Sequence, residues 1–307
     1  MRTQVYRLVA LSTLVCLSVP GRGEGRQAGF ERCGDPDPEL SIAACSAVIQ
    51  SGVQGTELAA AHTNRGIAYV VLVNYDRALQ DFERAIAADP KYTKAFANRG
   101  AVHGAKQSFD AAIADFTQVI ALDPKSATAF ADRASMHRLN GQLDEAIRDY
   151  GDAVARNSKF AEAWLNRAII LAGTSRCLEA IGDFARAIEI NPKEPIAFVD
   201  RGVCYESTGR AELALQDYTA HLRLDARSAY GFERRAALHF KTGDLAAAMA
   251  DFSQALIINP SSPSALYGRG AVKRARGDLA GGDADIATAV AMRPGVAETM
   301  AARGVKP

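Results

Sequence analysis

The sequence lacks a dominant charge and any apolar stretch long enough to cross a bilayer. Its 307 residues carry 36 Lys and Arg against 35 Asp and Glu, a formal net charge of +1. A near-neutral chain without a basic stripe argues against nucleic acid as a partner. The apolar run from Leu8 to Val19 has twelve residues, whereas a transmembrane helix needs about 20. We therefore expect no integral membrane span.

Signatures of chemistry are also missing. There is no glycine-rich phosphate loop, no nucleophile elbow and no His/Cys cluster with metal-ligand spacing. His103, His137 and His239 recur at one position of the repeat described below. Successive copies of that position lie about 10 Å apart, too far to share a metal ion. We expect these histidines to pack in the core, and we expect no cofactor, no metal and no catalytic residues.

The first 25 residues have the pattern of a secretory signal peptide. Arg2 and Arg7 make a basic start, the apolar run follows, and Pro20 ends it. The cleavage site is poorly defined, because no Ala-x-Ala stands there. This pattern predicts a periplasmic or secreted mature protein.

Four cysteines remain after the signal segment, and an even number in an exported chain suggests two disulfides. Cys33 and Cys45 are close in sequence. Cys177 and Cys204 lie at equal distances from the turn near Asn191, so two antiparallel helices would bring them level. The alternative is buried free thiols that pack as small hydrophobes.

A strict 34-residue period organises the rest of the chain. Seven arginines recur in phase, each followed sixteen residues later by an aspartate: Arg65 and Asp81, Arg99 and Asp115, Arg133 and Asp149, Arg167 and Asp183, Arg201 and Asp217, Arg235 and Asp251, Arg269 and Asp285. A fixed period of this size indicates stacked supersecondary units. We number them repeats one to seven: residues 59–92, 93–126, 127–160, 161–194, 195–228, 229–262 and 263–296.

Each repeat contains two helical patterns separated by a turn. In repeat two, Phe96, Gly100 and His103 share one face, and Ala112, Phe116, Val119 and Ile120 share another. Asp-Pro or Asn-Pro pairs end several second helices. Glycines mark the turn between the two helices in four repeats: Gly141, Gly209, Gly243 and Gly277.

These residues resemble the tetratricopeptide repeat (TPR) pattern. Repeat four fits it with Trp164, Ala168, Ala180, Phe184, Ala187 and Pro192. The resemblance implies an all-α fold, a right-handed superhelical solenoid of helix hairpins. Residues 26–58 would form an N-terminal cap with a helix, and residues 297–307 a truncated C-terminal capping helix. A fold does not name a partner.

The phased arginines and aspartates are expected to be level on adjacent antiparallel helices. We predict partly buried, bidentate ion pairs that join helices in every repeat. The alternative is a solvated charged face, on which each pair contributes little.

In the family, first helices line a concave groove that holds an extended peptide or a partner helix. The resemblance places eleven residues on that face: Lys94, Arg138, Glu162, Leu165, Ile169, Val199, Glu206, Tyr230, Glu233, Tyr267 and Arg274. Packing against neighbouring helices is an equally good explanation of the apolar members. We expect a non-catalytic scaffold that binds a protein or peptide. An accessory subunit that regulates or presents a cell-envelope enzyme, and a self-associating scaffold, are the alternatives.

Overall fold

The computed structural model describes residues 29–307, which form helices joined by short turns, without any strand in that range. The all-α architecture of helix hairpins is as predicted. The chain divides into two compact halves, one ending at Ser158 and the other starting at Lys159. The expected signal peptide lies outside the described residues.

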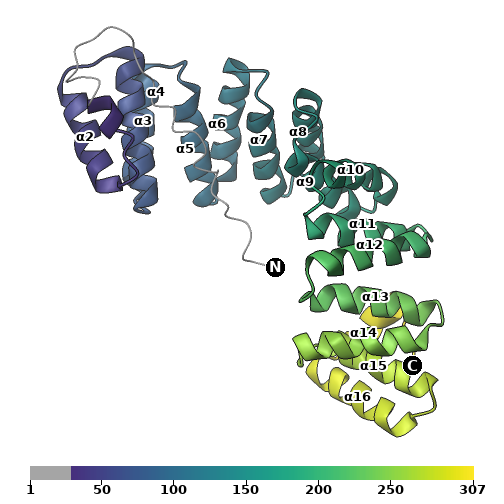
Figure 1. Ribbon diagram of the computed structural model, residues 1–307. Coiled ribbons are helices and arrows are strands. Elements are labelled where there is room, and N and C mark those ends of the chain that lie inside the picture. The colour runs from purple at the N-terminus through teal and green to yellow at the C-terminus, as the bar shows by residue number, and fades with distance from the viewer. Residues whose placement is uncertain (1–28) are drawn as a thin grey trace. The chain divides into compact units, whose positions relative to one another are not determined.

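The N-terminal half contains a cap helix and three helix pairs (Figure 1). Its helices are α2 (Pro38–Gln50), α3 (Gly55–Val71), α4 (Tyr75–Ala88), α5 (Thr93–Ala105), α6 (Phe109–Leu122), α7 (Ala127–Leu139) and α8 (Leu143–Arg156).

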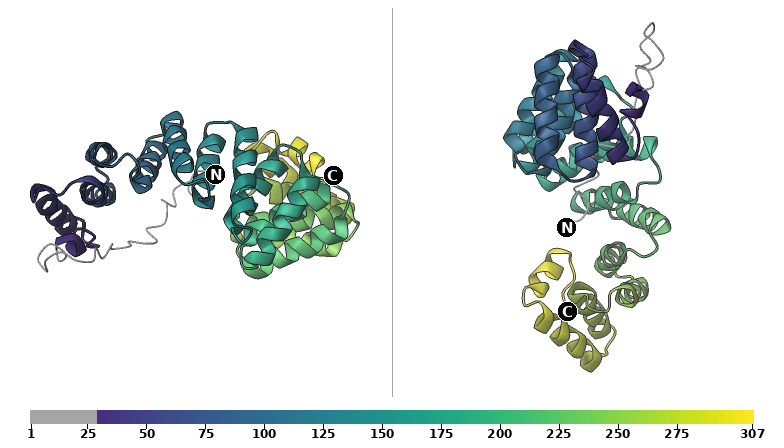
Figure 2. Two further views of the ribbon diagram at one scale, coloured as in Figure 1. Left: turned by 90° about the horizontal axis from the view of Figure 1, so that it is seen from above. Right: turned by 90° about the vertical axis from the view of Figure 1, so that its left-hand side faces the viewer.

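The C-terminal half contains four helix pairs and a short final helix, seen from two further sides in Figure 2. Its helices are α9 (Ala161–Gly173), α10 (Cys177–Ile190), α11 (Pro195–Ser207), α12 (Ala211–Leu224), α13 (Ala229–Lys241), α14 (Leu245–Ile258), α15 (Pro263–Ala275), α16 (Leu279–Met292) and α17 (Val296–Ala302). In both halves the first helix of each pair packs most extensively on its own second helix. It packs next on a neighbouring pair or, in the case of α3, on the cap helix α2.

One turn geometry joins the two helices of every repeat. In repeat three, Gly141 has a φ of +79°, and the Gln142 amide donates to the His137 carbonyl across the end of α7. This is a Schellman motif, which satisfies carbonyls left open at a helix end. Glycine fills the left-handed position in four repeats, but Val73, Gln107 and Ser175 fill it in the others with φ values of 57°, 61° and 63°.

Aromatic side chains of the second helices form the core between paired helices. Six of them are at most 2% exposed: Phe82, Phe116, Tyr150, Phe184, Tyr218 and Phe252. Burying one such ring stabilises the fold by about 2 kcal/mol. The first helix supplies a small residue opposite the ring. At Gly66, for example, an added Cβ would lie 2.5 Å from Phe82 Cε1.

The last helix pair approaches through two glycines. A Cβ on Gly270 of α15 would lie 2.7 Å from the Gly282 carbonyl oxygen of α16, and a Cβ on Gly282 would lie 2.7 Å from the Gly270 carbonyl oxygen. From Gly281-Gly282 alone one expects a weak helix. The structure shows that Gly282 permits close packing of two backbones.

Both cysteine pairs are bonded. The Cys33–Cys45 disulfide, with Cα atoms 4.5 Å apart, attaches the segment before α2 to the middle of that helix. The Cys177–Cys204 disulfide, with Cα atoms 5.1 Å apart, joins α10 of repeat four to α11 of repeat five. The second bond therefore adds a covalent link between neighbouring repeats.

The end of the chain departs from the repeat series. Arg303 stands 34 residues after Arg269 and so looks like an eighth phased arginine, but α17 ends at Ala302 and Gly304 has a φ of +79°. The amides of Gly304 and Val305 donate to the carbonyls of Ala301 and Met300, which closes a Schellman motif. Arg303 is thus the residue at which a seven-residue helix stops.

Candidate functional site

The phased arginines and aspartates form one ion pair in each repeat, between its own first and second helices. In repeat one, Arg65 Nε and Nη2 donate to Asp81 Oδ2 and Oδ1, both at 2.8 Å. The other six pairs repeat this bidentate arrangement. The aspartate side chains are only 3 to 13% exposed. These pairs belong to the scaffold, because both partners are engaged between helices.

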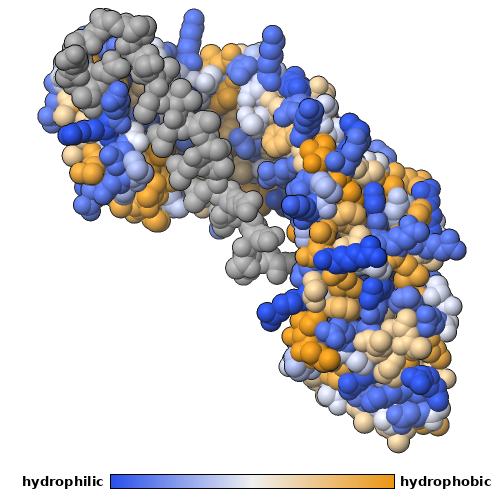
Figure 3. Space-filling model, in the orientation of Figure 1, coloured by the Kyte–Doolittle hydropathy of each residue, from blue (hydrophilic) through white to orange (hydrophobic). Residues whose placement is uncertain are grey.

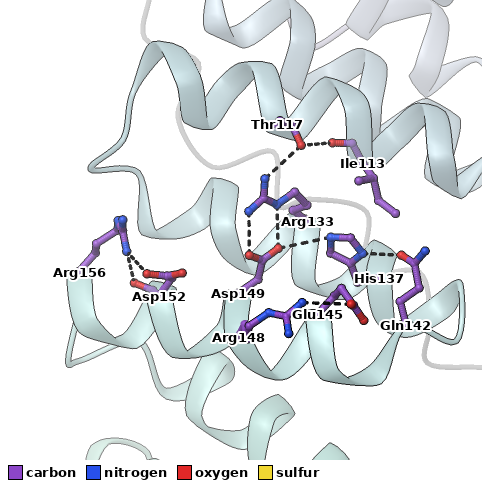
Figure 4. Close-up of polar contacts among 10 residues, drawn as sticks. All are labelled: Ile113, Thr117, Arg133, His137, Gln142, Glu145, Arg148, Asp149, Asp152 and Arg156. Atoms are coloured by element: carbon purple, nitrogen blue, oxygen red, sulfur yellow. Dashed lines mark hydrogen bonds and ion pairs between the residues drawn. The ribbon is translucent and has the colours of Figure 1, made fainter.

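The pair in repeat three shows how the arginine also reaches the preceding repeat (Figure 4). Arg133 of α7 binds Asp149 of α8 through Nε at 2.7 Å and Nη2 at 2.8 Å. Its Nη1 donates to Thr117 Oγ1 of α6 at 3.1 Å. His137 Nε2 lies 3.6 Å from Asp149 Oδ2. One guanidinium therefore connects three consecutive helices.

Two of these aspartates have lowered pKa values. Burial alone would raise the pKa of Asp81, but hydrogen bonds from Arg65 and His62 outweigh it and lower that pKa. Burial of Asp285 is likewise outweighed by Arg269 and Lys273, so its pKa is lowered too.

The eleven residues expected to face a partner all lie on first helices, but their exposure differs. Five are exposed: Lys94, Glu162, Ile169, Tyr230 and Arg274. Three are partly buried: Arg138, Leu165 and Glu206. Val199, Glu233 and Tyr267 are buried, at 4, 9 and 5% exposure. Lys94 and Arg138 belong to the N-terminal half and the other nine to the C-terminal half. On the side of the C-terminal half seen in Figure 3, hydrophobic residues lie among hydrophilic ones.

Glu206 takes part in a buried polar cluster that the sequence did not indicate. Its Oε2 accepts from Tyr218 Oη at 2.8 Å and from Arg234 Nη2 at 2.7 Å. The carboxylate and the guanidinium are 10 and 11% exposed. Burial raises the pKa of Tyr218, and Glu206 raises it further. Burial would lower the pKa of Arg234, but the charges of Tyr218 and Glu206 raise it.

Asp200 lies near this cluster, and its pKa is raised to about 6. The main cause is burial, which His221 and Arg234 oppose only in part. His221 is occupied elsewhere: its ring nitrogens lie 2.9 Å from the Pro195 carbonyl oxygen and 2.8 Å from Ser228 Oγ.

Glu233 of α13 is held from two directions. Ser262 Oγ, which caps α15, donates to Glu233 Oε1 at 2.5 Å. Arg303 Nη1 lies 3.7 Å from Glu233 Oε2, too far for a hydrogen bond, and this buried nitrogen has no hydrogen-bond partner among the described residues. Burial and repulsion from Arg234 lower the pKa of Arg303.

Three residues near this face, Asp200, Arg234 and Arg303, were therefore missed in the sequence. Asp200 and Arg234 stand directly before the phased arginine, at a position that is Asn or Asp in the first five repeats. Asp200 therefore looks like an ordinary member of the series, and Arg234 departs from it without any other signal. Arg303 falls at the phase of the seven paired arginines, which disguised its different place.

No helix within residues 29–307 has the length and hydropathy needed to span a membrane. In the same range, no three His, Cys, Asp or Glu side chains are grouped so that they could hold a metal ion.

Two family profiles, both described as tetratricopeptide repeat, match the chain. One covers residues 59–92, and the other covers residues 97–162, 132–195 and 165–229. Together they span more than half of the sequence. A search among curated proteins found no match.

Solved structures with the same fold cover most of the chain. The C-terminal part of a TPR repeat-containing protein from Cytophaga hutchinsonii superposes with a TM-score of 0.68 at 15% identity, over 79% of this chain and 98% of that one. YrrB, described as a TPR protein with an unusual peptide-binding site, superposes with a TM-score of 0.56 at 19% identity, over 61% of this chain and 97% of that one. PilW, described as a type IV pilus biogenesis factor, superposes with a TM-score of 0.55 at 20% identity, over 66% of this chain and 94% of that one. At these identities the likeness concerns the fold.

Proposed function

Because the chain belongs to the tetratricopeptide repeat family, we propose that it is a non-catalytic scaffold that binds a peptide or helix of a partner protein on its first helices. The chief support is the exposure of apolar side chains on those helices. Ile169 is 36% exposed and Tyr230 is 45% exposed. Ile196, near the start of α11, is also 36% exposed. Solvated apolar side chains on one face favour docking of another apolar surface.

Charges lie beside these apolar residues. Glu162 and Arg274 are exposed on the same set of helices, and Glu206 and Glu233 lie between them with little exposure. An apolar strip with charged neighbours suits an amphipathic segment, whose polar side chains set its direction and register.

We place this activity outside the cytoplasm, in the periplasm or in the secreted fraction. The two disulfides support this location, since such bonds persist in oxidising compartments. Alkylation of the protein isolated without reductant, followed by mass spectrometry, should find Cys33, Cys45, Cys177 and Cys204 unmodified. Four alkylated thiols would contradict this location.

The binding surface is tested by affinity capture from the protein's own envelope fraction. We expect Tyr230→Asp to lose a partner that the wild-type chain retains, because it places a charge in the apolar strip. The matched control is Ile257→Asp, on the second helix of repeat six, where the side chain is 73% exposed. Equal capture by both variants would refute this use of the first helices.

A further inference from the structure

The last residues of the chain lie on the first helices of repeats six and seven, on which a partner is expected. We call residues 296–307 the tail. Val296, Met300 and Val305 are all 0% exposed and share a core with Tyr267 and Ala271 of α15. Tyr267 is thus buried in the same cluster as the tail's own apolar side chains.

The tail also reaches back to α13. Arg303 is ion-paired with Glu233 at 3.7 Å, and a Cβ added at Gly304 would lie 3.1 Å from Cδ of Lys241. A helix stacked as the next member of the series would stand two repeats from α13, about 20 Å away. Contact with Glu233 and Lys241 therefore requires that the tail cross the face of α15.

The residues by which the tail docks follow a simple helical pattern. Val296, Met300 and Arg303 stand at i, i+4 and i+7, on one face of α17 and its C-cap residue. The Schellman motif at Gly304 then folds Val305 against Met300. The surface thus accepts two apolar side chains against α15 and one cation beside Glu233.

The fit of the cation is incomplete. Arg303 Nη1 is buried without a hydrogen bond among the described residues, and Arg234 close by repels the guanidinium. A donor that reached Glu233 at hydrogen-bond distance would satisfy this carboxylate better than the tail does.

Building on the proposed function, we propose that the tail is a built-in ligand of this surface and that the partner is an amphipathic helix which displaces it. The partner helix carries apolar residues at i and i+4 and Lys or Arg at i+7. The tail is tethered, so its effective concentration is in the millimolar range, and a free competitor binds the intact chain weakly. Removal of the tail's cation weakens the tail and exposes the surface.

The test uses a fluorescently labelled synthetic peptide with the sequence of residues 294–307, titrated with the oxidised full-length chain and followed by anisotropy. We expect Arg303→Glu to bind the peptide at least tenfold more tightly than the wild-type chain. Arg276→Glu, a charge reversal at an exposed position outside the contact, should match the wild type. Equal affinities for all three proteins, or no binding to any of them, would overturn the proposal.

Charge reversal on the surface distinguishes specific docking of the peptide from non-specific binding. A peptide carrying Glu at the position of Arg303 should fail to bind the Arg303→Glu chain. It should bind a chain that carries Glu233→Arg alone, in which the surface arginine repels Arg303 of the tail and pairs with the Glu of the peptide. Failure of this exchanged pair, with both chains folded by circular dichroism, would show that Glu233 does not select the cation.

Hydrogen exchange provides a measurement that needs no substitution. Excess peptide should increase exchange at the amides of α17 in the wild-type chain, because the tail leaves its place. Unchanged protection of α17 at saturating peptide would refute displacement.

The outcomes distinguish this inference from the proposed function. If Tyr230→Asp abolishes partner capture while Arg303→Glu changes neither capture nor peptide binding, the scaffold function stands and the tail proposal falls. If the peptide displaces the tail but neither protein captures a partner, the tail occupies the surface and the scaffold function falls.

Discussion

The Arg133–Asp149 pair permits a quantitative test of the ion-pair series. Asp149→Ala removes both carboxylate contacts of Arg133, whose side chain is 19% exposed in the intact pair. Thr117 remains as a hydrogen-bond partner, and the Phe130 ring stays 5.6 Å from the guanidinium carbon. Removing one partner of a fully buried pair costs about 3–5 kcal/mol. Since Arg133 can regain some water at its exposed edge, we expect a loss of about 2–3 kcal/mol.

The assay is urea unfolding followed by circular dichroism, with a matched surface control. Asp152 lies on the same helix and pairs with Arg156 at 2.8 Å, but its side chain is 49% exposed. Asp152→Ala should therefore cost less than about 0.5 kcal/mol. Because repeat proteins can unfold in parts, hydrogen exchange in α7 and α8 should show the same order.

A double substitution separates the pair from its members. Replacing Arg133 with Met and Asp149 with Leu removes the pair without leaving a buried charge, and such replacements are often nearly neutral. The double variant should be more stable than Asp149→Ala alone. If Asp149→Ala and Asp152→Ala differ by less than about 0.5 kcal/mol, the interhelical pairs are not a significant source of stability.

Three further substitutions test other features. Gly270→Ala should destabilise the chain by about 1–3 kcal/mol, because its Cβ would meet the backbone of Gly282. Its control, Gly182→Ala, has open space around the Cβ and should stabilise the chain by about 0.5–1 kcal/mol. Equal melting temperatures of the two variants would contradict the close approach at Gly270. Val73→Gly should raise the melting temperature, because it relieves a cost of about 1–2 kcal/mol at a positive φ; a lower value would refute the strain. Asp200→Asn should stabilise the protein by up to about 3 kcal/mol at pH 7.5, because the folded pKa of about 6 exceeds the unfolded value of about 3.9. The neutral carboxyl contributes its full stability below pH 4 and loses it as the pH rises through 6, so the gain from the substitution should vanish at low pH. A gain that does not depend on pH would refute burial of Asp200 as the cause.

The repeat itself could be predicted because the fold imposes one requirement at each step. An arginine on a first helix must meet an aspartate on the second helix, so the two recur sixteen residues apart in every repeat. The disulfide between Cys177 and Cys204 follows the same geometry, since antiparallel helices bring those positions level.

The turns were only partly predictable. Glycine signals the left-handed position in four repeats, but Val73, Gln107 and Ser175 adopt the same conformation because the paired helices on either side impose it. Tertiary packing here overrides a local preference. The residue type does not mark these three positions, and only their phase with Gly141, 34 residues apart, does so.

The polar cluster and the tail could not be predicted, for a different reason. Glu206, Tyr218 and Arg234 come from three helices, and their contact depends on how adjacent repeats stack. Arg303 shares the phase of the paired arginines, but α17 ends at Ala302, so Arg303 stands at the end of its helix and not within it. It pairs instead with Glu233, far back in the sequence.

This difference bears on how the scaffold could recognise one partner. A residue that recurs in every repeat presents the same chemistry at each step, so it cannot fix the register of a bound segment. Only side chains that occur once along the first helices can do so. In the C-terminal half these include Tyr230, Glu233 and Arg234 of α13. Tyr230 and Arg234 stand one helical turn apart, and Glu233 directly precedes Arg234. The periodic ion pairs hold the helices together, and the residues that break the period are those able to select a ligand.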